Sequence, residues 1–172
     1  MKKAKPASRF IAVIAGAIIA SFIFSVSQLR PANAAGAVEM QVERIVVQAI
    51  GEYNDAMAAG NPAGWLKYFT EGVRRRSPQS EQDGKEAFDD YYRKEFETFQ
   101  ARWTTSKMII AGRSAAVEFE WDAVHKASST PVKLNMVAVF QLAPNGKFES
   151  VNFYFDSVKL APYNVADAAA SK

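Results

Sequence analysis

Alternating apolar and polar residues dominate the second half of the chain and predict an antiparallel β-meander from Thr104 to Leu160. The clearest turn signal is Pro144-Asn145-Gly146-Lys147, because Asn-Gly accepts the positive φ angles of a tight hairpin. Four consecutive strands joined by short turns predict a sheet with one face that needs a cover. The expected strands cover residues 104–110, 115–126, 132–142 and 148–160.

Apolar residues recur at intervals of three and four upstream of these strands and predict three helices. The first extends from Ala37 to Ala59, and Asn61 begins a short second one as its N-cap. Asp83 and Glu86 have capping-box spacing ahead of the third helix. Val73 to Pro78 predicts a brief strand, with a polar connection after it. The order of elements favours the α+β class.

Strand alternation predicts which side chains face the core. Val117, Phe119 and Trp121 share one face of their strand, and acidic residues occupy the other. The last two strands carry apolar residues on both faces. Because an exposed apolar patch of that size is unusual on a monomer, we expect a homodimer that forms through the outer face of the sheet.

Residues 1–34 have the order of a secretory signal peptide. Basic residues precede an apolar run from Phe10 to Phe24, and Ala32-Asn33-Ala34 is an A-x-A cleavage site. Cleavage after Ala34 would export the protein to the periplasm or the extracellular space. The alternative is an uncleaved membrane anchor, so a membrane partner is expected only in that case.

The net charge of +3 comes from this leader. Five of the 21 Lys and Arg lie within residues 1–34, whereas all 18 acidic residues follow it, so the remainder has a net charge of −2. A nucleic-acid-binding domain usually shows a basic face, so no nucleic-acid partner is expected. One histidine, no cysteine and no glycine-rich phosphate loop predict no metal and no cofactor. Arg74, Arg75 and Arg76 are either an anion site or the solvated charges of an edge strand.

Several short segments, taken in order, resemble a known family. They are Tyr53-Asn54-Asp55-Ala56-Met57-Ala58-Ala59-Gly60-Asn61, Phe69 with Pro78, Gly84-Lys85-Glu86-Ala87-Phe88, and Asn145-Gly146-Lys147-Phe148 ending in Tyr154-Phe155-Asp156. The chain resembles the nuclear transport factor 2-like superfamily, and within it the SnoaL-like group, over residues 38–160. The resemblance implies a cystatin-like, cone-shaped fold in which a curved antiparallel sheet wraps around three N-terminal helices. It also implies a pocket at the wide end. The Ala-rich, polar composition of the C-terminal residues separately predicts a flexible tail at residues 161–172.

Ketosteroid isomerase has this fold and uses a carboxylate base, a tyrosine and a protonated aspartic acid. The tyrosine position falls on Tyr53, which is present. The base position falls on Ser77 and the acid position on Ala138, neither of which can perform the required proton chemistry. The resemblance therefore does not extend to steroid isomerisation.

SnoaL-like cyclases use an aspartate with a nearby histidine, and the matching residues here are Asp156 and His125. A carboxylate and an imidazole in an apolar pocket could shuttle a proton. The alternatives are that Asp156 binds backbone donors at the strand end and that His125 lies on an exposed rim. Tyr53 completes the candidate catalytic set.

Five further residues are candidates for ligand contact. Asn152 and Tyr154 alternate onto the face of Asp156 and would line any cavity that Asp156 faces. Trp65, Tyr91 and Trp121 are aromatic residues that either line the pocket or fill the core.

Three functions remain open at this stage. The first is an exported domain that binds a small apolar molecule in the pocket of the cone. The second is a cofactor-independent acid/base isomerase, cyclase or hydratase that uses Asp156 with His125 or Tyr53. The third is a membrane-anchored periplasmic assembly module, which requires the leader to be retained.

Overall fold

Three helices and six strands make up the fold in a computed structural model that describes residues 32–163. The four long strands of the predicted meander are all present, in the predicted order. The helices are α2 (Ala32–Ala59), α3 (Ala63–Leu66) and α4 (Lys85–Thr98). The strands are β1 (Phe69–Arg76), β2 (Glu81–Asp83), β3 (Phe99–Ala111), β4 (Ser114–His125), β5 (Thr130–Leu142) and β6 (Phe148–Phe155). Two 3-10 turns follow, at Ser157–Lys159 and Ala161–Tyr163.

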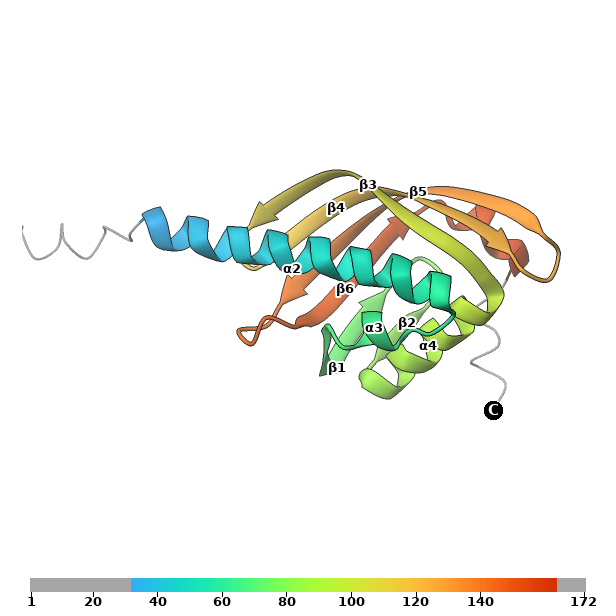
Figure 1. The fold of residues 1–172 in the computed structure, drawn as a ribbon, viewed down its shortest axis with the longest axis horizontal. Coiled ribbons are helices and arrows are strands. Elements are labelled where there is room, and N and C mark those ends of the chain that lie inside the picture. Colours follow the sequence, from blue (N-terminus) through green and yellow to red (C-terminus); the bar gives the residue numbers. More distant parts are fainter. Residues whose placement is uncertain (1–31, 164–172) are drawn as a thin grey trace, which may run out of the picture. The chain divides into compact units, whose positions relative to one another are not determined.

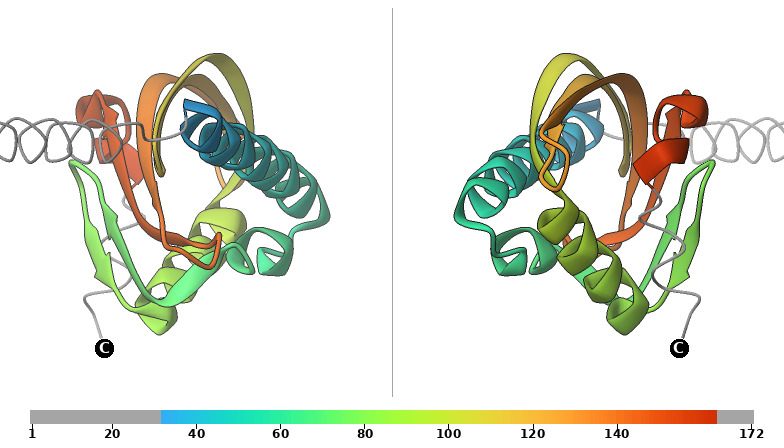
Figure 2. Two further views of the ribbon diagram at one scale, coloured as in Figure 1. Left: turned by 90° about the vertical axis from the view of Figure 1, so that its left-hand side faces the viewer. Right: turned by 90° about the vertical axis from the view of Figure 1, so that its right-hand side faces the viewer.

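All six strands form one sheet in the order β2-β1-β6-β5-β4-β3. Neighbouring strands are antiparallel except β1 and β6, which are parallel. The sheet curves strongly, and the helices lie on its concave side (Figures 1 and 2). This architecture confirms the predicted α+β class with a curved sheet around N-terminal helices.

The core lies between the concave face of the sheet and the apolar stripes of the helices. Tyr53 and Met57 of α2, Trp65 of α3 and Phe88 of α4 are fully buried. On β4 the predicted alternation holds, because Val117, Phe119 and Trp121 are buried and the acidic residues between them face outward. Burying an apolar side chain of this size contributes about 1.5–3 kcal/mol, so the interior accounts for most of the stability.

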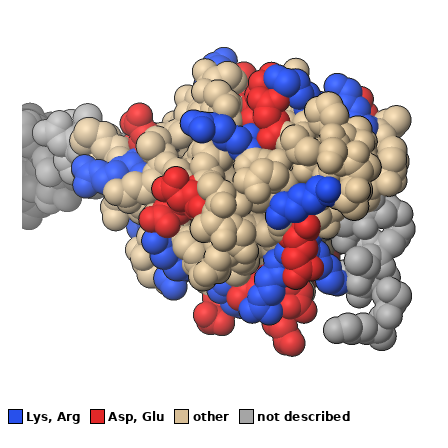
Figure 3. All heavy atoms as spheres, turned by 45° about the vertical axis from the view of Figure 1, so that its right-hand side comes forward, with Lys and Arg blue, Asp and Glu red and all other residues tan. Residues whose placement is uncertain are grey.

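Charges on the surface are mixed. On the face drawn in Figure 3, Lys and Arg lie beside Asp and Glu without an extended patch of one sign. Exposed pairs such as Lys133 with Asp122, at 2.8 Å, are typical of this surface. Such pairs contribute little to stability.

The segment between α3 and α4 differs from the prediction. β1 begins earlier than the expected brief strand, and Glu81–Asp83, expected as a connection, forms β2 by pairing with β1. The expected capping box at α4 is wrong, because Gly84 is the N-cap and no side chain caps the helix. Asp83 instead accepts a hydrogen bond from Arg76 Nη2 at 2.8 Å. The carboxylate of Asp83 therefore pairs with Arg76 and does not cap the N-terminus of α4.

The predicted domain boundaries fall near both ends of the described range, residues 32–163. Residues 1–31 of the expected leader lie outside the described residues, and its last three residues belong to α2. Cleavage after Ala34 stays a prediction. Of the expected tail, residues 161–163 form the last 3-10 turn, where the Tyr163 ring lies 4.9 Å from the ring of His125. Residues 164–172 lie outside the described residues.

Two glycines provide a matched test of backbone conformation. Gly84 has φ of 86° and ψ of 161°, a region that is essentially restricted to glycine, so Gly84→Ala is expected to destabilise the protein by about 1–3 kcal/mol. Gly51 lies on an exposed position of α2 with free space around it, so Gly51→Ala is expected to stabilise by about 0.5–1 kcal/mol. Urea unfolding of both variants would check the opposite signs. Equal effects would contradict the assigned conformation of Gly84.

Candidate functional site

A small cavity lies inside the curved sheet, beside α4. Its volume is about 30 Å³, enough for one or two water molecules. The walls are mainly aromatic and apolar, with a polar group at one side made by Arg75 and Glu95. The lining residues are Arg75, Gln79, Tyr91, Tyr92, Glu95, Phe99, Trp103, Trp121, Leu134, Met136, Phe153, Phe155 and Leu160.

Glu95 is the buried acid of this cavity, with 8% of its surface exposed. It lies on the apolar face of α4, four residues after Tyr91 and three after Tyr92, which brings the three side chains to one side of the helix. The Tyr53 hydroxyl donates a hydrogen bond of 2.6 Å to Glu95 Oε1 and accepts one of 3.3 Å from Trp121 Nε1. This relay from β4 through α2 to α4 fixes the position of the carboxyl group.

Burial raises the pKa of Glu95, because the charged carboxylate is poorly solvated inside the protein. The hydrogen bond from Tyr53 and the positive charge of Arg75 lower this pKa and only partly offset burial. Burial and the nearby Glu95 together raise the pKa of Tyr53 well above its ordinary value, so its hydroxyl keeps its proton and remains a donor. An acid whose pKa is raised toward neutrality is suited to proton transfer.

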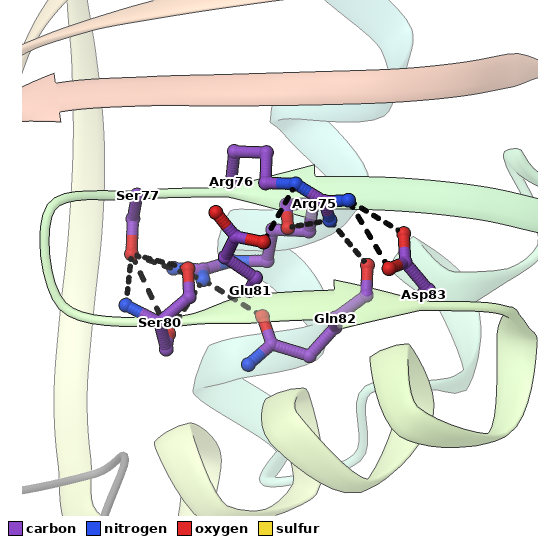
Figure 4. A network of polar contacts seen from close by, with 7 residues as sticks. All are labelled: Arg75, Arg76, Ser77, Ser80, Glu81, Gln82 and Asp83. Atoms are coloured by element: carbon purple, nitrogen blue, oxygen red, sulfur yellow. Dashed lines mark hydrogen bonds and ion pairs between the residues drawn. The ribbon is translucent and has the colours of Figure 1, made fainter.

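Arg75 places a guanidinium group inside the fold, with 3% of its surface exposed. Its Nη1 donates to Gln82 Oε1 at 2.9 Å, Ser80 Oγ at 3.1 Å and Ser77 Oγ at 3.3 Å, all from the β1–β2 hairpin (Figure 4). The guanidinium carbon lies 3.7 Å from the centre of the Tyr91 ring. Its Nε is buried without a hydrogen-bond partner. Arg75 is therefore held rigidly and retains an unused donor.

The structure brings three of the predicted site residues to the cavity. Trp121 and Tyr91 line it, and Tyr53 lies behind the lining, where its hydroxyl donates a hydrogen bond to the lining residue Glu95. Trp65 does not line it. Its ring packs in the core against Tyr53, with ring centres 5.5 Å apart, and against Phe69 at 4.7 Å. Trp65 is thus a packing residue in this structure.

Asp156 and His125 do not line the cavity. Asp156 is exposed and caps the first 3-10 turn, with Oδ1 accepting a hydrogen bond from Val158 N at 3.1 Å. His125 Nδ1 lies 2.8 Å from Ser128 Oγ on the surface. His125 pairs with Thr130 of β5, whereas the strand residue before Asp156 pairs with Met136, which corresponds to about 20 Å along the strand. The structure does not bring these two side chains together.

Asn152 and Tyr154 face the outer side of the sheet and, like Asp156, do not line the interior cavity. Val151, Phe153 and Phe155 occupy the inner face of β6 by plain alternation, and a register irregularity near Gln141 and Leu142 adds Phe148 to that face. Tyr154 lines a shallow outer groove of about 470 Å³, and Asn152 lines a depression of about 160 Å³. The outer face is therefore more polar than the sequence pattern suggested.

Sequence reasoning missed Glu95, and it considered Arg75 only as one of three arginines that form either an anion site or the solvated charges of an edge strand. On α4, Glu95 lies at a position where the three- and four-residue repeat predicts a buried side chain. On β1, alternation predicts that Arg75 faces the opposite side from Arg74 and Arg76. Among residues 32–163, no three His, Asp or Glu side chains gather as a metal site would require. None of the helices in that range is both long and apolar enough to cross a membrane.

Comparisons with known proteins agree with the predicted family. A family model of the SnoaL-like domain matches residues 50–151. The chain is similar to SalBIII, an epoxide hydrolase/cyclase-like enzyme of pyran ring formation in the polyether salinomycin, with 21% identity, 70% of this chain and 95% of that chain covered, and a TM-score of 0.63. It is also similar to a proposed SnoaL-like polyketide cyclase from Jannaschia sp. CCS1, with 18% identity, 75% and 94% coverage and a TM-score of 0.61. A proposed isomerase from Bacillus subtilis has 13% identity, 71% and 94% coverage and a TM-score of 0.63.

At these identities the structural likeness establishes the fold and not the reaction. A search of curated proteins found no match. The family model covers more than half of the chain, and the order of helices and strands agrees with the resemblance expected from the sequence. The chain belongs to the family of SnoaL-like domain proteins.

Proposed function

We propose that the protein binds a small, largely apolar molecule in the interior cavity. The observation that carries this proposal is the composition of the cavity, whose aromatic and aliphatic walls surround a buried carboxyl group and a guanidinium group with an unused donor. Ligand sites typically combine apolar walls with a few fixed polar groups. Relatives whose names denote cyclases or isomerases support the proposal at the level of the family.

Ligand binding would require the rim to open and the cavity to widen, because its volume of about 30 Å³ holds only one or two water molecules. Gln79, Phe155 and Leu160 are only partly buried. Gln79 Nε2 donates to Ser157 O at a long distance of 3.4 Å, which links the β1–β2 turn to the first 3-10 turn. This weak link at the rim is the part of the lining most easily opened.

Two substitutions on adjacent residues of β5 test this proposal. Met136 and Val137 both line the outer groove, but only Met136 also lines the cavity, so Met136→Trp is expected to block binding and Val137→Trp to leave it unchanged. Thermal shift and native mass spectrometry with cyclohexanone, phenol, indole and hexanamide would measure binding. Absence of binding by the unmodified protein, or equal effects of the two variants, would contradict the proposal.

A second candidate is acid/base catalysis, favoured by the raised pKa of Glu95 and by its hydrogen bond from Tyr53. In this scheme the Glu95 carboxylate removes a proton from the carbon next to a carbonyl group, and the Glu95 acid returns it to another carbon. Arg75 would stabilise the enolate oxygen, and Tyr53 would position Glu95. Deuterium uptake from solvent into cyclohexanone should fall at least about 100-fold in Glu95→Gln. Unchanged uptake would exclude this role.

Glu95 thus takes the role that the sequence assigned to Asp156, with the same class of chemistry. Export, the homodimer through the outer sheet face and the membrane-anchored alternative remain predictions. The polar outer face gives less support to the dimer than the sequence pattern did. Apolar residues also contribute to it, beside Glu118 and Glu120; they are Ile109, Val124, Val137, Val139 and Tyr154.

A further inference from the structure

The three consecutive arginines of β1 differ sharply in their surroundings. Arg74 faces outward and is exposed. Arg76 pairs with two carboxylates, Glu81 at 3.2 Å and Asp83 at 2.8 Å. Arg75, the most buried of the three, forms no ion pair with any described residue, and its hydrogen-bond acceptors are neutral oxygens. A buried charge normally requires a partner of opposite sign, so this guanidinium is unusual.

Glu95 forms no direct ion pair with Arg75, although the positive charge of Arg75 lowers the pKa of Glu95 from a longer distance. It is the one carboxyl group among the described residues that line the cavity, yet no ion pair joins it to Arg75, and its Oε1 accepts the hydrogen bond from Tyr53. The β1–β2 hairpin has enough acidic residues to neutralise Arg76, but it presents only Gln82 and two serines to Arg75. The hairpin thus fixes the guanidinium without neutralising it.

The geometry of the unused donor indicates the kind of anion. The three hydrogen bonds of Arg75 to the hairpin all involve Nη1, and the buried Nε has no partner, while the hydroxyl groups of Tyr91 and Tyr92 also interact with the guanidinium. A planar carboxylate accepts two parallel hydrogen bonds from the Nε edge of a guanidinium. Phosphate would leave a third oxygen among the aromatic walls, where the lining supplies no second cationic group.

We infer that the molecule bound in the cavity is a small organic carboxylate, whose two oxygens contact Arg75 and whose apolar part lies against the aromatic walls. This inference rests on the proposed ligand-binding function and narrows it to a substrate class. Arg75 acts as the specificity-determining residue. The apolar part of the ligand would lie toward Trp103 and Phe153.

Matched acids and amides test the inference on the unmodified full-length chain. Isothermal titration calorimetry would compare benzoate with benzamide and hexanoate with hexanamide, with inorganic phosphate as a further probe. Each acid is expected to bind about 10- to 100-fold more tightly than its amide, because the amide lacks the charge that pairs with Arg75. Arg75→Met should remove this preference. Arg74→Met, a change at the exposed neighbour, should keep it.

The outcomes distinguish failure of the carboxylate inference from failure of the proposed ligand-binding function. Amides that bind as tightly as acids would overturn the carboxylate inference and leave small-molecule binding intact. Binding of neither would overturn the proposed function itself. Binding of phosphate alone would also overturn the inference. If Arg75→Met does not fold, the acid and amide comparison on the unmodified protein still decides, and Arg75→Lys, with a point charge and no planar edge, should bind the acids more weakly.

Discussion

Replacement of Trp65 by alanine is expected to lower the free energy of unfolding by about 3–5 kcal/mol, because it removes a large, fully buried ring from the core. The Trp65 ring contacts four other aromatic rings at centre distances from 4.7 to 5.6 Å. Those rings come from α2, β1, α4 and β3, so little local collapse can fill the space. Urea unfolding followed by circular dichroism would measure the loss.

Tyr154→Ala provides the control for this prediction. Tyr154 is also a large aromatic residue, but it is 56% exposed on the outer sheet face. Its replacement is expected to cost less than about 0.5–1 kcal/mol, as for most surface substitutions. The opposite ranking of the two variants would contradict the packing role of Trp65.

The fold could be predicted because its signals are local. Strand alternation in β4 and β5 and the Asn-Gly turn each specify structure within a few residues. Gly146 has φ of 77° in that turn, as the sequence suggested, although Asn145 does not share a positive φ. The expected helices agree with α2, α3 and α4 to within a few residues.

The pairing of β1 could not be predicted in the same way. β1 joins β6 in parallel across more than 70 residues of sequence, and β2 has only three residues, so neither gives an extended periodic signal. Without β2, the chemistry of Arg75 could not be foreseen, since all three of its acceptors lie on the hairpin that β2 forms. An interior position for one arginine of three follows from alternation once the strand is known.

The sequence favoured residues near strand ends as the candidate site, and two of them, Asp156 and His125, do not line the interior cavity. Asp156 was chosen by resemblance at the end of the last strand, but β6 stops at Phe155 and Asp156 turns outward to cap a 3-10 turn. Glu95 was overlooked because acidic residues on a helix are usually solvated. Its spacing of four and three residues from Tyr91 and Tyr92 indicated that it shares their face of the helix. The fold then shows why its burial is tolerated, because the Tyr53 hydroxyl of α2 donates a hydrogen bond to it.

Glu95 is expected to make the stability of the protein fall as the pH rises. Burial raises the pKa of Glu95 in the folded state above the ordinary value of 4.5, so the folded protein holds this proton more tightly than the unfolded chain. The stabilising contribution is complete below the unfolded pKa and is lost as the pH rises through the folded pKa. Each whole pH unit between the two pKa values corresponds to about 1.4 kcal/mol.

The other titratable groups that face Glu95 keep their charge state across this range. They are Arg75 of β1, which stays charged, and Tyr53, Tyr91 and Tyr92, whose pKa values are all raised by burial so that they stay neutral. Glu95→Gln removes the titration and keeps the shape of the side chain. The difference in unfolding free energy between the unmodified protein and Glu95→Gln should therefore move in favour of the variant from pH 4 to pH 8.

Urea unfolding of both proteins at each pH measures this difference, and Tyr53→Phe sharpens the test. Loss of the Tyr53 hydroxyl removes a donor that stabilises the carboxylate, so it should raise the pKa of Glu95 further and extend the decline to higher pH. A difference that does not change with pH would mean that Glu95 has the same pKa in the folded and unfolded chain, so that it is charged inside the fold at neutral pH. In that case Arg75 would already have its counter-charge, and an anionic ligand would no longer be required to balance it.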